Sequence, residues 1–160
     1  MKNVLVACAV LFSFQAFADD DLKPAQEEAK EAFEKDLDKD LKAVNEKCGT
    51  KVGITVDWKN YDAAAIKKAN INFPSFCREA LIDPVSKMCD RAAYKKSIAK
   101  QLTALKCNVT GGTAKTKEQK SSEYTQSHMK FEKGVFSYTL QFDHSNLSDN
   151  GKAVLEKSFN

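Results

Sequence analysis

Cysteines are the residues of this chain whose types and spacing point most directly to chemistry. Cys8 lies in an apolar N-terminal stretch, whereas Cys48, Cys77, Cys89 and Cys107 are spread through the body of the chain. No two of these four have the separation of about two to four residues that zinc fingers and ribbons use, so no metal site is predicted. In an exported protein, an even set of cysteines forms disulfides, and four cysteines allow three pairings. The sequence therefore predicts two disulfides.

The expected helices favour one of the three pairings. Cys77 and Cys89 are predicted to lie on two short helices that meet at Pro84, so that their side chains can face each other across the corner. This leaves Cys48, at the end of the first helix, to pair with Cys107 on a strand. We therefore expect Cys77–Cys89 and Cys48–Cys107.

Histidine is the side chain best suited to acid–base chemistry near neutral pH, and the chain has two, His128 and His144. Asp143-His144-Ser145 contains the residue types of a hydrolase triad, but consecutive side chains at a strand end point apart and cannot relay a proton. The sequence has no G-x-S-x-G elbow, no H-E-x-x-H helix and no phosphate-binding glycine loop. No catalytic residue and no cofactor is predicted, and a hydrolytic enzyme using His144 or His128 is the alternative.

The first 18 residues have the three parts of a secretory signal peptide. Lys2 is followed by the apolar stretch 4–14 and by Ala16-Phe17-Ala18, a small-x-small cleavage site. Residues 19–160 are then expected to form a single exported domain, periplasmic or extracellular, that has lost Cys8 with the leader. No later stretch reaches the roughly 20 apolar residues of a membrane span, so no integral membrane segment is expected after cleavage.

Charge is unevenly distributed along the predicted mature chain. Residues 19–47 carry 11 acidic and 6 basic side chains, whereas residues 48–160 carry 18 basic and 11 acidic ones. The basic residues are scattered, so a nucleic-acid partner is not predicted, and an acidic arm can instead fold back onto a basic body. The partner we expect is an unknown protein or envelope component.

An amphipathic helix is predicted over residues 24–47. Its apolar side chains recur every three or four residues and form one narrow stripe. The stripe contains Ala29, Phe33, Leu37, Leu41, Val44 and Cys48. We interpret the stripe as packing on its own domain, and partner binding through this acidic helix is the alternative. Gly49 is placed for a left-handed helix cap.

The remaining pattern predicts an α+β fold. Strands are expected at 51–58 and 103–110, and a hairpin of 128–132 and 135–142 turns at Lys133-Gly134. Short helices are expected over 63–69, capped by Asp62, over 76–82, capped by Ser75, and from Pro84 to a break near Asp90, which would cap a helix over 91–102. Residues 111–127 are expected to form a long loop with an edge strand near Tyr124, and Ser148 to cap a last helix. Together they predict a small antiparallel sheet of three to five strands with helices mainly on one face.

The function expected from these features is binding. An exported, disulfide-stabilised domain without catalytic geometry suits a non-enzymatic binding protein, an inhibitor or an envelope-assembly factor. Lys95, Lys96 and Lys100 fall on or near the solvent side of their helix, and Tyr61 belongs to an aromatic group with Trp58. These three lysines and Tyr61 are the candidate binding surface.

Overall fold

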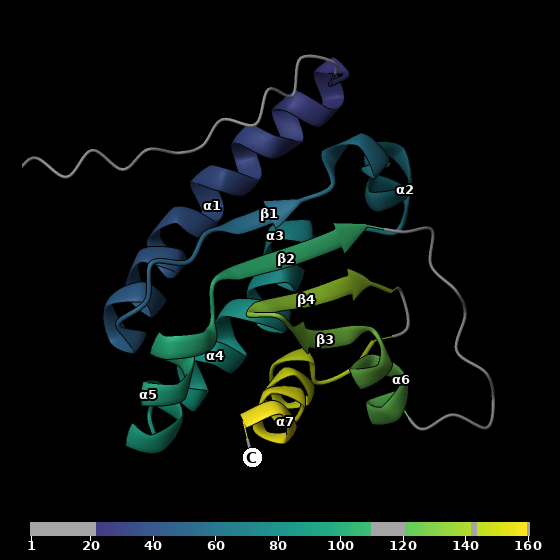
Figure 1. Cartoon of the computed structure of the whole chain (residues 1–160). Helices are drawn as coiled ribbons and strands as arrows, with labels where there is room; N and C mark the ends of the chain where they lie inside the picture. Colours follow the sequence, from purple (N-terminus) through teal and green to yellow (C-terminus); the bar gives the residue numbers. More distant parts are fainter. Residues whose placement is uncertain (1–21, 110–120, 142–143, 160) are drawn as a thin grey trace, which may run out of the picture.

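The computed structural model describes residues 22–109, 121–141 and 144–159. The predicted signal peptide therefore lies outside the described residues, as do residues 111–120 of the predicted loop, the last residue of each of the predicted strands 103–110 and 135–142, and Asp143. The elements in chain order are α1 (Pro24–Cys48), β1 (Ile54–Val56), η1 (Trp58–Asn60), α2 (Ala63–Lys68), α3 (Phe73–Cys77), η2 (Arg78–Ile82), α4 (Asp83–Met88), α5 (Ala92–Gln101), β2 (Ala104–Val109), α6 (Ser121–Ser127), β3 (Met129–Glu132), β4 (Val135–Leu140) and α7 (Leu147–Phe159) (Figure 1).

The four described strands form one sheet in the order β1-β2-β4-β3. This confirms the predicted α+β fold and the number of strands. The expectation of an antiparallel sheet was wrong, because β1, β2 and β4 are parallel and only the β3–β4 hairpin is antiparallel. Six helical elements, η1, α2, α3, η2, α4 and α5, lie between β1 and β2, and such a long connection carries the chain back to the end of the sheet where it started.

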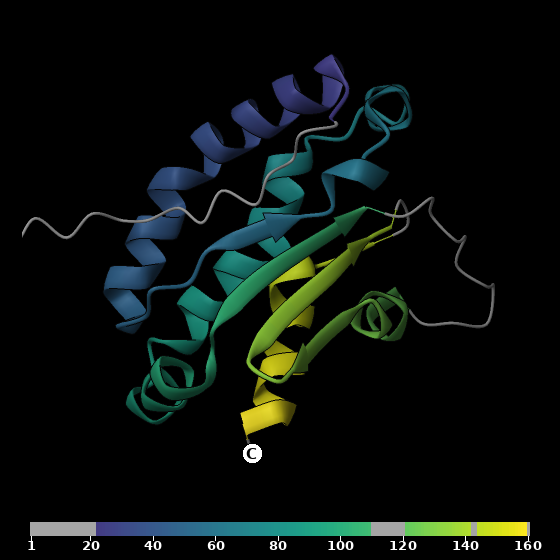
Figure 2. The same cartoon turned by 45° about the horizontal axis from the view of Figure 1, so that its top comes forward.

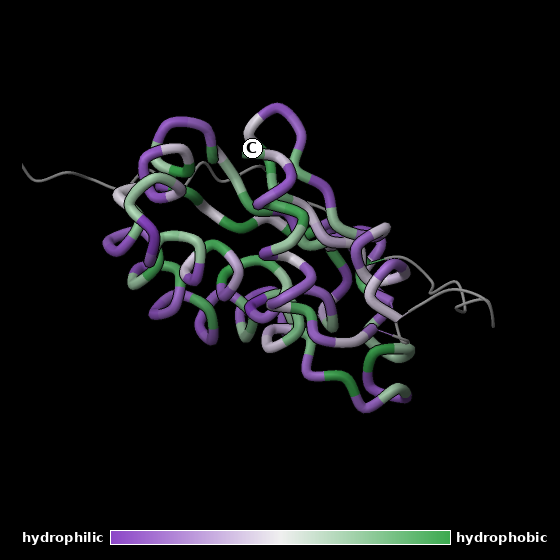
Figure 3. Tube along the Cα trace, turned by 90° about the horizontal axis from the view of Figure 1, so that it is seen from below, coloured by the Kyte–Doolittle hydropathy of each residue, from purple (hydrophilic) through white to green (hydrophobic). Residues whose placement is uncertain are grey.

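The two faces of the sheet differ in what covers them. In Figure 2 the strands lie in front of α3, α4 and α7, so the helices pack on one face, as predicted. The side chains on that covered face are apolar and buried: Leu105, Cys107, Val109, Met129, Phe136, Tyr138 and Leu140. Their neighbours in the strands point the other way, and among them Thr55, Lys106 and Lys130 are exposed. We call this second side the open face. The hydropathy colouring of Figure 3 places the apolar segments between the layers and the hydrophilic ones on the outer turns.

A single helical run from Phe73 to Met88 crosses the middle of the covered face. It was expected to break before Pro84, because proline has no N–H for the carbonyl four residues earlier and clashes with it. Instead, η2 is one π-helical turn, in which the Asp83 N–H donates to the Arg78 carbonyl. This wider turn lets the helix pass through Pro84 without a new start. The run also begins earlier than predicted, since Asn72 rather than Ser75 supplies the cap.

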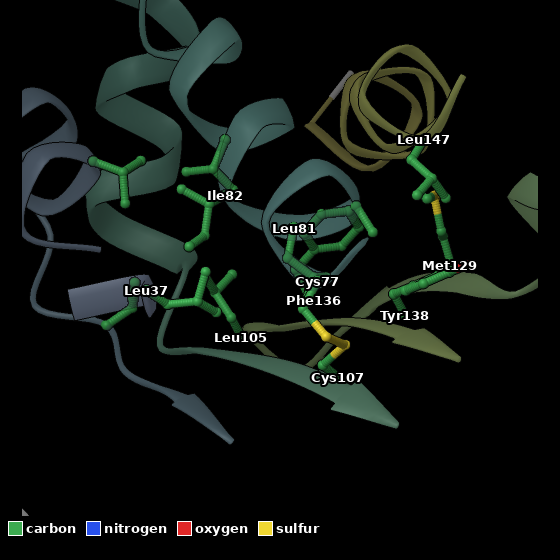
Figure 4. Packing of buried hydrophobic residues seen from close by; sticks show 14 of the residues in the cluster. Leu37, Cys77, Leu81, Ile82, Leu105, Cys107, Met129, Phe136, Tyr138 and Leu147 are labelled. Atoms are coloured by element: carbon green, nitrogen blue, oxygen red, sulfur yellow. A yellow bond between two sulfur atoms is a disulfide. The ribbon is translucent and has the colours of Figure 1, made fainter. Parts of the chain in front are cut away.

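The continuous run decides the disulfide pairing. Cys77 and Cys89 are twelve residues apart along it, which at the helical rise separates them by about 18 Å, too far for a bond. Cys77 pairs instead with Cys107 on β2, and Cys48 pairs with Cys89, with Cα atoms 5.9 and 5.4 Å apart. Two disulfides were correctly predicted, but the expected pairing was wrong. One bond joins the central helix to the sheet (Figure 4), and the other joins the ends of α1 and α4.

Helix α1 packs on its own domain through the predicted stripe. Phe33, Leu37 and Val44 are only 2–3% exposed, and the helix ends at Gly49, whose φ of 70° is the predicted left-handed cap. At its other end, the amide of the buried Gln26 donates to the carbonyls of Lys59 and Tyr61. Helix α1 is therefore held at both ends and along its length.

Several local predictions need correction. The strand predicted at 51–58 is only β1, and Trp58 lies in the 3-10 turn η1, although its side chain is buried as expected. Asp90 caps no helix but forms an ion pair with Lys47, with 2.7 Å between Oδ1 and Nζ. Tyr124 lies in helix α6, not in an edge strand.

The caps and turns of the second half are decided by individual backbone angles. Ser148 lies inside α7, which Asn146 precedes with a left-handed φ of 46°. The hairpin turn is as predicted, and Lys133 and Gly134 have φ values of 51° and 82°. A Cβ on Gly134 would also lie 2.7 Å from the Gln101 carbonyl oxygen, so glycine is required there for space as well.

Candidate functional site

Both histidines lie at the same edge of the sheet. Because β1, β2 and β4 are parallel, their carboxyl ends meet there, and His144 follows β4 by four residues. Strand β3 runs the opposite way, so the residue that precedes it, His128, reaches the same edge; its carbonyl accepts the N–H of Thr139 on β4. The carboxyl edge of parallel strands is where ligand sites of α/β sheets form, which makes this edge the first candidate.

The ring of His128 is held by helix α6. Its Nδ1 lies 2.8 Å from the Tyr124 carbonyl oxygen and 3.2 Å from Ser127 Oγ. The Tyr124 ring packs against it with centroids 4.8 Å apart. A carbonyl can only accept, so the neutral ring carries its proton on Nδ1 and leaves Nε2 as the basic nitrogen.

His144 is oriented in the same way by different partners. Its Nδ1 is hydrogen-bonded to the Gln141 carbonyl, and the ring stands edge-on against Phe76, with centroids 4.3 Å apart. The Gln141 side chain in turn accepts a hydrogen bond from the Tyr124 hydroxyl at 3.3 Å. Tyr124 and Gln141 thus connect the surroundings of the two histidines.

Buried polar groups around this edge hold the backbone in place. Thr125, 1% exposed, donates to the Ser121 carbonyl and accepts the N–H of Ser145. Asn150, 5% exposed, donates to the Ser145 carbonyl. Burial also raises the pKa of the Tyr138 hydroxyl well above its usual range, against the opposing effect of the Gln141 backbone. Thr125 and Asn150 thus hold the backbone of Ser145, shortly after β4.

The chemistry open to the histidines is limited by what surrounds them. Within the described parts of the chain, neither Nε2 has a hydrogen-bond partner, and the group that orients each ring is a neutral carbonyl, not a carboxylate. Nor do the described residues bring three histidine, cysteine or acidic side chains together as metal ligands do. A basic Nε2 without an adjacent nucleophile falls short of a catalytic triad.

Tyr61 and the three lysines of the predicted binding surface lie at opposite ends of the sheet. Tyr61 follows the carboxyl end of β1 and packs on Trp58 and Phe73, with both ring distances at 5.3 Å. Burial raises the pKa of its hydroxyl. Lys95, Lys96 and Lys100 are exposed on α5, which leads into the amino end of β2. The structure therefore does not bring Tyr61 to the lysines.

The structure adds other lysines to those of α5. Lys106 and Lys130 project from the open face, both opposite Ser137 in the strand register. Lys133 occupies the hairpin turn, which lies against the end of α5 because the Gly134 carbonyl accepts the Thr103 N–H at 2.8 Å. In β2 the side chain of Lys106 points away from the side of Leu105 and Cys107. The alternation of apolar and polar residues in the sequence was therefore sufficient to predict that Lys106 is exposed. The position of Lys133 near the end of α5, and that of Lys130 one strand beyond Ser137, required the strand order.

No protein-family model, no curated protein and no solved structure matches the chain. None of the described helices has both the length and the apolar composition of a membrane span.

Proposed function

We propose that this protein is an exported, non-enzymatic binding protein of the cell envelope or its surroundings, and that it binds through the open face and α5. The observation that carries the proposal is the contrast between the two faces of one sheet. One face is filled by apolar side chains and a disulfide, whereas the other presents Thr55, Lys106, Ser137 and Lys130 in one register row. A rigid face of this kind, free of core packing, is suited to an external partner.

Export is part of the proposal. The two disulfides support it, because such bonds persist in oxidising compartments and are rare in the cytosol. The leader-like residues 1–18 support it from the sequence side. A scaffold that binds outside the cytosol gains from cross-links that keep its binding face in one shape.

Site-specific photo-crosslinking in the native host tests the binding role. A photoreactive residue at Ser137 or Thr55 on the open face should give a defined adduct. The same residue at Lys35 or Lys39 on the exposed side of α1 is the control and should give none. Adducts from the α1 positions alone would contradict the proposal and favour partner binding through the acidic helix.

A hydrolytic enzyme is the second candidate, favoured by the fixed tautomers that leave Nε2 of His128 and His144 basic. If the protein only binds, His128→Ala and His144→Ala should each complement a deletion strain as well as the parent does. Loss of complementation by either variant, with an unchanged melting temperature, would favour the enzyme.

A further inference from the structure

The basic side chains of α5 and the sheet form a set with few acidic neighbours. Residues 91–109 contain five basic side chains and no aspartate or glutamate. Helix α1 is the opposite case, since its 25 residues include eight acidic and five basic side chains. We call Lys96, Lys100, Lys106, Lys130 and Lys133 the lysine surface.

The elements that carry the lysine surface meet at one end of the sheet. Lys96 and Lys100 are one turn apart on the side of α5 opposite the buried Ile98. The turn that carries Lys133 touches the end of the same helix, because the Thr103 N–H donates to the Gly134 carbonyl. Lys106 and Lys130 flank Ser137 across β2, β4 and β3, two strand spacings or about 10 Å apart. In Figure 2 the start of β2 and the β3–β4 turn lie at the same end of the sheet.

These five ammonium groups are available to an external partner. All five residues are exposed, and none forms an ion pair with a residue of the described ranges 22–109, 121–141 and 144–159. Elsewhere in the described structure, lysines form ion pairs within the protein: Lys47 pairs with Asp90, and Lys87 pairs with Asp149. Glu132 is the one acidic side chain that β2, β3, β4 and α5 contribute.

We propose that the lysine surface docks the protein on an anionic phospholipid membrane, a proposal that rests on the binding role assigned above to the open face and α5. The cations are all lysines, which act as point charges and lack the planar fork with which arginine grips a single phosphate or carboxylate. They are spread over a broad surface between small side chains such as Thr55 and Ser137. A spread array of point charges complements a spread array of lipid headgroups better than one bound anion.

Vesicle co-sedimentation of the purified exported protein tests this. Vesicles of phosphatidylcholine with about one third phosphatidylglycerol should bind the protein at 50 mM salt, and pure phosphatidylcholine vesicles should not. Each lysine near such a surface contributes about 1 kcal/mol, or about fivefold in affinity, so Lys96→Gln/Lys106→Gln/Lys130→Gln should weaken binding about 100-fold. Raising the salt to 500 mM should release the parent protein, because the screening length becomes shorter than the spacing of the charges.

A matched variant controls for net charge. Lys35→Gln/Lys39→Gln/Lys67→Gln removes three exposed charges from α1 and α2 and should leave vesicle binding within about threefold, well short of the effect expected for three docking lysines. Equal loss in both triple variants would overturn the proposal, as would binding to uncharged vesicles or no binding to anionic ones. If vesicles do not bind but Ser137 still crosslinks to an acidic protein in the host, the membrane docking is wrong and the binding role stands.

Discussion

The two faces of the sheet are built from alternating residues of the same strands, and yet they differ in burial and in composition. On β4, Phe136 is 0% exposed and packs in the core, whereas the next residue, Ser137, points to the open face. The covered face packs against α3, α4 and α7, carries the Cys77–Cys107 disulfide and contains most of the apolar side chains. The open face receives lysines and hydroxyls. If the open face binds a partner as proposed, stability and binding are separated in this molecule, and substitutions on one face should leave the other unaffected.

The largest expected contrast is between adjacent residues of β4. Phe136→Ala should lower the free energy of unfolding by about 4 kcal/mol, since it removes a ring from a filled core. Ser137→Ala should change it by no more than about 0.5 kcal/mol. Urea denaturation of the two variants measures the difference. Similar losses of unfolding free energy in both variants would mean that the side chains of the open face also stabilise the fold.

The disulfides are expected to have the next largest effect. They close loops with sequence separations of 30 and 41 residues, for which loop entropy predicts a loss of about 3.5–4 kcal/mol on removal of either. The variants are Cys77→Ala/Cys107→Ala and Cys48→Ala/Cys89→Ala, compared by thermal melting. Peptide mapping without reduction should recover the same two pairs, and recovery of Cys77 joined to Cys89 would contradict the continuous helix.

Helix α1 extends the comparison to the acidic part of the chain. Leu37 lies on the buried side of α1 and is 3% exposed, so Leu37→Ala should destabilise the isolated protein by about 3 kcal/mol. Lys39→Ala, on the solvent side, should be neutral within about 0.5 kcal/mol. A melting curve of Leu37→Ala that overlays the parent curve would favour a helix that awaits a partner.

The contact between α4 and α7 depends on the absence of a side chain. A Cβ on Gly151 would lie 2.6 Å from Pro84 Cγ and 2.9 Å from the Ala80 carbonyl oxygen. Gly151→Ala should therefore destabilise the protein by about 2 kcal/mol, although alanine is the better helix former. The measurement is a chemical denaturation curve. A gain in stability would show that α7 can move away from the π turn at little cost.

The smallest effect is expected where the same two helices meet at the surface. A hydrogen bond from Lys87 lowers the pKa of Asp149, so the ion pair stabilises the fold above the ordinary pKa of aspartate, and this contribution disappears as the pH falls through the lowered value. Asp149→Asn should cost less than about 1 kcal/mol at pH 7 and nothing at pH 2, because the pair is exposed. A difference from the parent that persists at pH 2 would assign the effect to packing.

Local patterns in the sequence determined the elements whose causes are local. The spacing of apolar residues located α1, the alternation in β2 and β4 identified their buried sides, and Gly49 and Gly134 marked a cap and a turn by the positive φ that glycine allows. The number and identity of the disulfide cysteines also followed from composition and from the predicted signal peptide. Each of these inferences needs only neighbouring residues.

Tertiary structure decided the features that depend on distant residues. Cys77 pairs with Cys107 and not, as predicted from the sequence, with Cys89, because the helix continues through Pro84 by means of a π turn. The π turn relieves the clash that ends most helices at proline. The parallel order of β1, β2 and β4 followed from the path of the helices between them, which no strand encodes. The surroundings of His128 and His144, and the approach of the hairpin turn at Lys133 to the end of α5, likewise exist only once the strands are ordered. Side-chain periodicity specifies which face of an element is buried, but only the packed chain specifies what that face meets.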